Sequence, residues 1–180
     1  MPGTGEVWIF AYGSLIWRPD FDFAERPRAR LDGYRRGFFM TSIHYRGTPE
    51  APGLVLALDA EPGASCEGVA YRLDPGKASE ILEGVRAREL VSRAYDERML
   101  PVVLEDGRRV EAITYVVNRV HAQYRGGLDP AAQAEVIARA VGPMGPNIDY
   151  LESTVAGLAA LGVSDPDLGE LLALARAAVR

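Results

Sequence analysis

Apolar and β-branched residues in the first two thirds of the chain come in short runs that favour strands. Gly, Pro or acidic residues bound these runs, and the dipeptide Asp106–Gly107 between two of them is a strong hairpin signal. The predicted strands are Val7–Tyr12, Leu31–Met40, Leu54–Asp59, Cys66–Leu73, Glu97–Leu104 and Arg109–Val117. We expect them to form one mainly antiparallel sheet that curls into a barrel.

Apolar residues with helical spacing occur once between the predicted strands, and they predominate in the last third of the chain. Asp74 is predicted to cap the first helix, with Pro75 at its first position. Three further segments follow: Pro130–Val141, one capped by Asn147, and one that Asp165 and Pro166 open. Because no repeat or linker divides the chain, we expect a single α+β domain over residues 1–180, with helices beside the barrel.

Composition and charge narrow the classes of partner. Apolar residues make up 48% and charged residues 25%, which is ordinary for a globular protein. The net charge of −5 is spread along the chain without a basic run, so we expect no nucleic-acid partner. No stretch approaches the roughly 20 apolar residues of a membrane span, and Met1–Glu6 lacks the pattern of a signal peptide. The single cysteine favours the cytoplasm, and two distant histidines make a metal site unexpected.

The first candidate for chemistry is the point where the first strand runs into Gly13 and Ser14. A glycine lets the backbone turn sharply, and exposed amides in such a turn can hold a carboxylate or a developing oxyanion. An ordinary strand-to-loop turn is the alternative, and composition alone favours it. Ser14 is a poor candidate nucleophile, because Ile16 stands where a nucleophile elbow requires glycine.

The second candidate is Glu89, which continues the apolar stripe of the first predicted helix. The stripe consists of Ala78, Ile81, Leu82 and Val85. A carboxylate in the next position of a buried stripe is costly, so it usually has a partner or a task, and burial would raise its pKa. Two alternatives stay open: the helix frays before Glu89, or Glu89 pairs with Arg86 or Arg93 on the surface.

Other polar residues are weaker candidates. Arg46, in the turn-like segment 44–49, could hold a carboxylate with two hydrogen bonds, although a loop arginine is usually solvated. Four tyrosines could supply hydroxyl groups to a pocket, although packing is the more usual role for each of them. They are Tyr95, Tyr115, Tyr124 and Tyr150.

Taken together, these segments resemble the ChaC family of γ-glutamylcyclotransferases. The matching segments, in the family's order, are Phe10–Trp17, His44–Gly53, Cys66–Leu73, Arg88–Glu89 followed by Tyr95, and Ala140–Leu151. In this chain Ala11 replaces a glycine that is usual in the family, and Arg93–Ala94 replaces paired glycines before the tyrosine. The second departure concerns the loop between Glu89 and Tyr95, on the leaving-group side of the expected pocket.

The resemblance implies a mixed, mainly antiparallel barrel with flanking helices, and an enzyme without cofactor or metal. It implies that Glu89 is the general acid and base that cleaves glutathione, a small-molecule substrate, into 5-oxoproline and Cys-Gly. The implied substrate-binding residues are Ala11, Tyr12, Gly13, Ser14, Leu15, Ile16, Arg46, Tyr95 and Tyr124. Two rival hypotheses remain: a cyclotransferase for other γ-glutamyl amino acids or amines, and a binding module without activity. The sequence predicts no oligomeric state.

Overall fold

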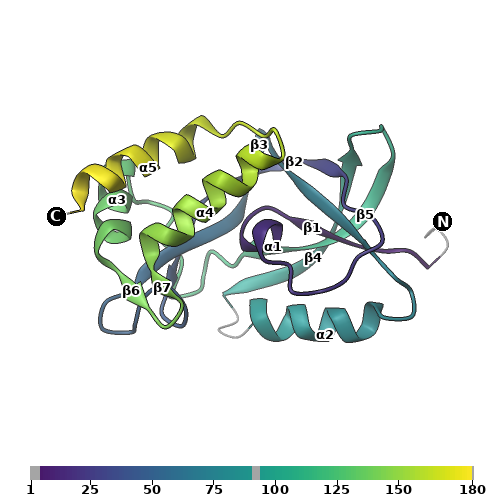
Figure 1. Cartoon of the computed structure of the whole chain (residues 1–180), viewed down its shortest axis with the longest axis horizontal. Coiled ribbons are helices and arrows are strands. Elements are labelled where there is room, and N and C mark those ends of the chain that lie inside the picture. Colours follow the sequence, from purple (N-terminus) through teal and green to yellow (C-terminus); the bar gives the residue numbers. More distant parts are fainter. Residues whose placement is uncertain (1–4, 91–93, 180) are drawn as a thin grey trace. The chain divides into compact units, whose positions relative to one another are not determined.

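The computed structural model describes residues 5–90 and 94–179, and five of its strands form a closed barrel (Figure 1). The strands are β1 (Val7–Ala11), β2 (Arg28–Ser42), β3 (Gly53–Leu73), β4 (Tyr95–Leu104) and β5 (Arg109–Val117). They close in the order β1-β3-β2-β4-β5, with β3 also paired to β5. The pairs β1–β3, β2–β4 and β4–β5 are antiparallel, whereas β5 runs parallel to β1 and β3. The predicted mixed, mainly antiparallel α+β barrel is confirmed.

The strand boundaries agree with the hydrophobic runs except in β3. The hairpin of β4 and β5 turns where it was expected, and Gly107 has the positive φ of +91° that such a turn needs. The two strands predicted as Leu54–Asp59 and Cys66–Leu73 are a single strand of 21 residues. Gly63 has a φ of +86° inside it, so the turn residues there mark a local irregularity within a continuous strand.

Two helices lie between strands of the barrel in the sequence, one after β1 and one after β3. The short helix α1 (Ser14–Trp17) follows β1 directly, and the sequence pattern did not predict it. The helix α2 (Ala78–Glu89) precedes β4. The prediction that Asp74 caps this helix is wrong. The Asp74 carboxylate accepts a hydrogen bond from the Gly76 amide at 2.8 Å, which forms a separate turn, and Lys77 is the residue at the helix start.

The last third of the chain contains three helices and a small hairpin. These elements are α3 (Pro130–Arg139), β6 (Val141–Gly142), β7 (Gly145–Pro146), α4 (Asn147–Ala160) and α5 (Pro166–Ala178). As predicted, α5 begins at Pro166 directly after Asp165, and the Asp165 carboxylate caps it by accepting a hydrogen bond from the Leu168 amide. The prediction for Asn147 is wrong: Pro146 is the capping position of α4, and the Asn147 side chain bonds to the backbone of Leu54 instead.

The chain divides into two compact units, and the division passes through β2 and β3. The first unit is Met1–Arg36 with Leu58–Asn118, and the second is Gly37–Ala57 with Arg119–Arg180. Large buried side chains of the first unit include Ile9, Phe10, Leu31, Leu58, Tyr71, Leu73, Leu104 and Tyr115. Those of the second include Phe38, Met40, Leu54, Ile137, Leu151, Leu158 and Leu171. The expectation of one domain stays a prediction. Within the described residues, no helix is long and apolar enough to cross a membrane.

Candidate active site

Glu89 is the last residue of α2, and its side chain is only 17% exposed. Ala78 and Val85, earlier on the predicted stripe, are buried. The carboxylate therefore lies on the side of the helix that faces the protein. Burial raises the pKa of Glu89, and the charge of Arg88 lowers that pKa in part. A raised pKa of Glu89 is what its position on the apolar stripe predicts.

The alternatives left open for Glu89 can be compared with this geometry. The helix does not end before Glu89, because α2 includes it and the Leu90 amide still bonds to the Arg86 carbonyl at 2.8 Å. Arg86 does not take Glu89 as its partner. It donates from Nε and Nη2 to the carboxylate of Glu97, at 2.8 and 2.9 Å. The other suggested partner, Arg93, lies outside the described residues.

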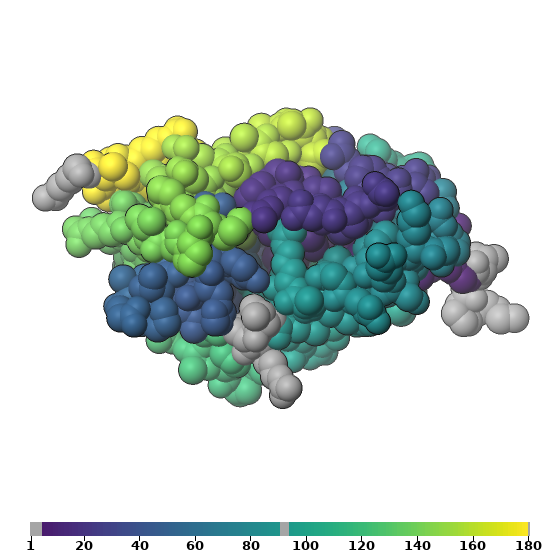
Figure 2. All heavy atoms as spheres, turned by 60° about the horizontal axis from the view of Figure 1, so that its bottom comes forward, coloured from purple at the N-terminus to yellow at the C-terminus, as the bar shows by residue number. Residues whose placement is uncertain are grey.

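The turn after β1 is attached to the end of α2 through Arg88. Its Nη2 donates to the Ser14 hydroxyl at 2.7 Å, and its Nη1 donates to the Arg18 carbonyl, also at 2.7 Å. The two segments adjoin on one face of the molecule, where the purple N-terminal atoms meet the teal atoms around α2 (Figure 2). The Gly13–Ser14 turn and the end of α2 that carries Glu89 are therefore held next to each other by the Arg88 side chain.

Most side chains of the predicted substrate segment belong to the core. Ala11, Leu15 and Ile16 are buried, and the Tyr71 hydroxyl donates to the Leu15 carbonyl at 2.7 Å. Tyr12 is also buried, and its hydroxyl donates to a backbone carbonyl of β5 at 2.9 Å. The groups of this segment that could contact a ligand are therefore the backbone of the turn and the side chain of Ser14, which is half-buried.

Tyr115 is both buried and part of a chain of hydrogen-bonded polar side chains. Its hydroxyl donates to Glu97 Oε2 at 3.0 Å, and Glu97 is held in turn by Arg86. Burial raises the pKa of Tyr115, and the negative charges of Glu97 and Glu89 raise it further. Tyr95, predicted to contact substrate, begins β4 opposite Val117 and is half-buried. Its role stays a prediction.

Two predicted substrate residues belong to the second unit. Arg46 is buried, its Nη1 donates to the Pro146 carbonyl at 3.2 Å, and its guanidinium lies 5.8 Å from the centre of the Tyr150 ring. Tyr124 forms an isolated bridge with Met40. These contacts explain how both residues are held, and their roles toward a substrate stay predictions.

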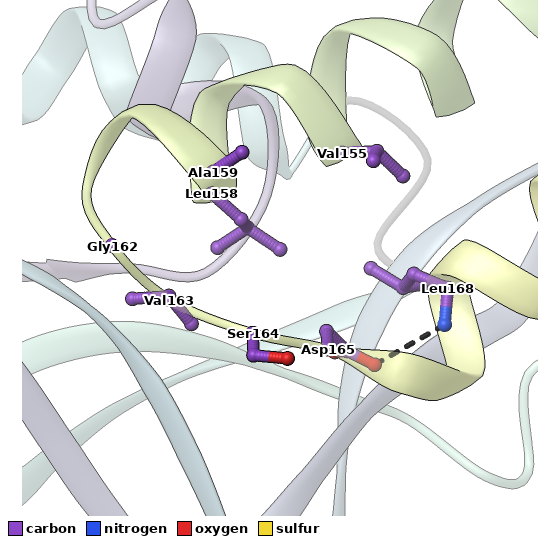
Figure 3. Close-up of a pocket in the computed structure, with 8 residues that line it drawn as sticks. All are labelled: Val155, Leu158, Ala159, Gly162, Val163, Ser164, Asp165 and Leu168. Atoms are coloured by element: carbon purple, nitrogen blue, oxygen red, sulfur yellow. Dashed lines mark hydrogen bonds between the residues drawn. The ribbon is translucent and has the colours of Figure 1, made fainter.

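A hollow of about 370 Å³ in the second unit offers little chemistry. It lies between the end of α4 and the start of α5, and its lining is Val155, Leu158, Ala159, Gly162, Val163, Ser164, Asp165 and Leu168 (Figure 3). The Asp165 carboxylate is used as the helix cap. Among the residues that the structure describes, no group of three or more His, Cys, Asp or Glu side chains is placed to hold a metal ion.

The contact of Arg88 with Ser14 is the feature of the site that sequence reasoning missed. Helical spacing predicts partners for Glu89 three and four residues away, at Arg86 and Arg93, where side chains share a helix face. Arg88 directly precedes Glu89, and adjacent helical side chains point in directions about 100° apart. Only the fold reveals that one of these directions leads to the turn after β1.

A family model and curated relatives point to the same protein family. Residues 7–178 match the family model described as ChaC-like protein. The chain is 37% identical over 171 residues to the glutathione-specific γ-glutamylcyclotransferase of Escherichia coli K12, covering 95% of this chain and 73% of that protein. It is 32% identical to γ-glutamylcyclotransferase 2-3 of Arabidopsis thaliana, covering 92% and 86%. A crystal structure of a glutathione-specific γ-glutamylcyclotransferase from yeast has a TM-score of 0.89 at 24% identity, covering 97% of each chain. That likeness concerns the fold.

Proposed function

Because this chain belongs to the ChaC-like protein family, we propose that it is a glutathione-specific γ-glutamylcyclotransferase. The names of its relatives support the substrate, and one observation in this chain supports the chemistry. Glu89 is a mostly buried carboxylate with a raised pKa, at a helix end that Arg88 links to a glycine turn. A group of this kind is suited to proton transfer.

The reaction is an intramolecular aminolysis. The α-amine of the γ-glutamyl residue attacks its own γ-amide carbonyl, and a five-membered lactam closes. The amide C–N bond then breaks, which releases 5-oxoproline and the amine of Cys-Gly. Nucleophile and electrophile belong to one molecule, so the protein's main task is to hold a folded conformer. The proposal includes no cofactor or metal, because ring closure involves no oxidation or reduction and the proposed roles of Glu89 and the turn after β1 cover proton transfer and charge stabilisation.

Glu89 carries the proton in this scheme. As a carboxylate it accepts the proton that the attacking amine loses, and as a carboxylic acid it returns that proton to the departing amine. The raised pKa suits both halves of the task, because the group must bind the proton and then release it. The charge of Arg88 opposes this rise in the pKa and so favours the ionised form of Glu89.

The turn after β1 is proposed to hold the γ-glutamyl group. Its backbone amides would stabilise the oxyanion that develops on the γ-carbonyl, and Gly13 would leave room for the substrate to approach. Ser14 contributes a hydroxyl that Arg88 already orients. Arg46, Tyr95 and Tyr124 are proposed as further substrate contacts. We place the enzyme in the cytoplasm, where a lone, buried thiol such as that of Cys66 is ordinary.

The decisive assay measures 5-oxoproline released by the purified protein from glutathione, in parallel with γ-Glu-Ala, in the presence of a chelator. We expect release from glutathione and little from γ-Glu-Ala. If 5-oxoproline is released faster from γ-Glu-Ala than from glutathione, the proposed specificity for glutathione is wrong, whereas the cyclotransferase chemistry still holds. No release from either compound by folded protein would contradict an enzymatic role and favour a binding module.

A further inference from the structure

All three nitrogens of the Arg88 guanidinium are engaged, and they face different parts of the site. Nη2 donates to the Ser14 hydroxyl and Nη1 to the Arg18 carbonyl, each at 2.7 Å. Nε lies 3.7 Å from Oε1 of Glu89. Nη1 also lies 3.5 Å from the Asp20 carboxylate. The Arg88 side chain is 25% exposed, so these contacts are partly shielded from water.

Only arginine can make this set of contacts. The guanidinium is a rigid planar fork whose donors point in fixed directions, whereas a lysine ammonium is a single point charge on a flexible stem. A lysine at position 88 would keep the charge near Glu89 but could not reach Ser14 and Arg18 in the same way. The side chain therefore combines two separable properties, a geometric link and a positive charge.

We propose that Arg88 is a positioning residue, which fixes the turn after β1 relative to the Glu89 carboxylate and keeps that carboxylate ionised at working pH. The proposal rests on the proposed function, because it assigns the residue a part in that reaction. The link to Ser14 sets where the γ-glutamyl group lies, and the charge sets the protonation state of the base.

The charges around Glu89 make the effect of Arg88 predictable. From its own helix the carboxylate faces Arg88, and from β5 it faces the buried Tyr115. The neighbouring Glu97 and Arg86 are bonded to each other, so their charges largely cancel. Removing the Arg88 charge leaves burial unopposed and raises the pKa of Glu89. The acid limb of the rate profile then moves to higher pH.

Three variants separate the two properties. Arg88→Gln removes both charge and fork, and Arg88→Lys removes the fork alone. Lys77→Gln is the matched control, because Lys77 is an exposed cation at the opposite end of the same helix and pairs with Asp22 at 3.5 Å. Circular dichroism and thermal melting establish that each variant is folded before any comparison is made.

The first measurement is independent of activity: the carboxyl carbon of Glu89 is titrated by ¹³C NMR, with Glu89→Gln to assign the signal. We expect Arg88→Gln to raise the midpoint by about one pH unit or more, as loss of an adjacent opposite charge does. Arg88→Lys and Lys77→Gln should leave it close to the wild-type value. An unchanged midpoint in Arg88→Gln, or an equal rise in Lys77→Gln, overturns the electrostatic half.

The second measurement is the pH profile of kcat/KM for glutathione. We expect Arg88→Lys to keep the wild-type acid limb but lose about tenfold or more in its plateau, since a misplaced substrate reacts more slowly. Arg88→Gln should show both the loss and the shifted limb. A wild-type plateau in Arg88→Lys overturns the geometric half. If the wild-type protein itself is inactive, the proposed function fails, and the NMR titration still decides the electrostatic half of the Arg88 proposal.

Discussion

Asn147 in the second unit and Glu89 in the first unit are both shielded polar groups, but their surroundings are opposite. In the second unit, Asn147 is fully buried and satisfied: its side chain accepts from the Leu54 amide and donates to the Leu54 carbonyl, both at 2.8 Å. In the first unit, Glu89 is mostly buried, yet within the described residues its carboxylate has only the ion pair with Arg88 at 3.7 Å and no hydrogen bond.

The difference separates groups that stabilise a fold from groups that remain available for chemistry. A buried amide whose oxygen and nitrogen each have a hydrogen-bond partner stabilises one arrangement of a strand and a helix. A buried carboxylate without hydrogen bonds lowers stability but retains its capacity to bind a proton or a ligand. Variants on the two sides of this comparison should therefore affect activity in one unit and stability in the other.

The largest effect is expected from Glu89→Gln, which keeps the shape of the side chain and removes its basicity. Turnover of glutathione should fall about 100- to 10,000-fold, the usual contribution of a general acid–base group. The fold and much of the substrate affinity should remain. The matched control is Glu135→Gln in α3, because Glu135 is an exposed carboxylate whose partner is Arg139 on the same helix. Near-normal turnover in Glu89→Gln would show that Glu89 is not the base.

The next largest effect concerns two glycines. Gly13→Val places a branched side chain in the proposed substrate turn, and activity should fall on the order of 100-fold with a smaller change in stability. Gly142→Ala in the second unit should do the reverse, because a Cβ there would lie 2.3 Å from the Tyr45 carbonyl oxygen. Activity and melting temperature of both proteins give the test. Equal losses of folding in both would make Gly13 a structural turn only.

Asn147→Ala should act on stability alone. It leaves the buried amide and carbonyl of Leu54 without their side-chain partner, which costs about 2–4 kcal/mol in the free energy of unfolding. Urea denaturation measures the loss. The turnover number per folded molecule should stay near the wild-type value. A large loss of turnover in protein shown to be folded would contradict a purely structural role for Asn147.

The smallest effect is a pH-dependent gain of stability in Glu89→Gln. Folding raises the pKa of Glu89, so the folded protein binds this proton more tightly than the unfolded chain does. The resulting stabilisation is complete below the unfolded value of about 4.3 and is lost as pH rises through the folded pKa. The neutral variant should therefore melt at a higher temperature than wild type near pH 7.5, and the difference should vanish below about pH 4. Equal differences at both pH values would contradict this account of burial.

The fold followed from the sequence where the signal was local. The Asp106–Gly107 hairpin and the start of α5 after Asp165 depend on neighbouring residues, and both were predicted. Two cap predictions were wrong for different reasons: the Asp74 carboxylate forms a local turn with a nearby backbone amide, whereas a distant group competes for the side chain of Asn147. Asn147 has the composition of a helix cap, but Leu54 provides it with two hydrogen bonds instead. Such a choice depends on tertiary packing, which no local pattern contains.

The candidate site shows the same limit. The position of Glu89 on an apolar stripe predicted a shielded carboxylate, because helical periodicity is a local property. The bond from Arg88 to Ser14 joins residues 74 positions apart, and nothing in the spacing of the chain indicates it. Sequence reasoning thus identified the group proposed for the chemistry and missed the group proposed to position it.

The most direct test of the central claim is the rate of 5-oxoproline release from glutathione as a function of pH, measured with and without EDTA. The account predicts a rate that climbs from acid pH with a midpoint above the ordinary glutamate value of about 4.3 and levels near or above neutrality. EDTA should leave the curve unchanged, because ring closure by Glu89 requires no metal ion. A rate that EDTA abolishes and a divalent cation restores would contradict the proposed mechanism, as would a rate that does not fall at acid pH while the protein remains folded.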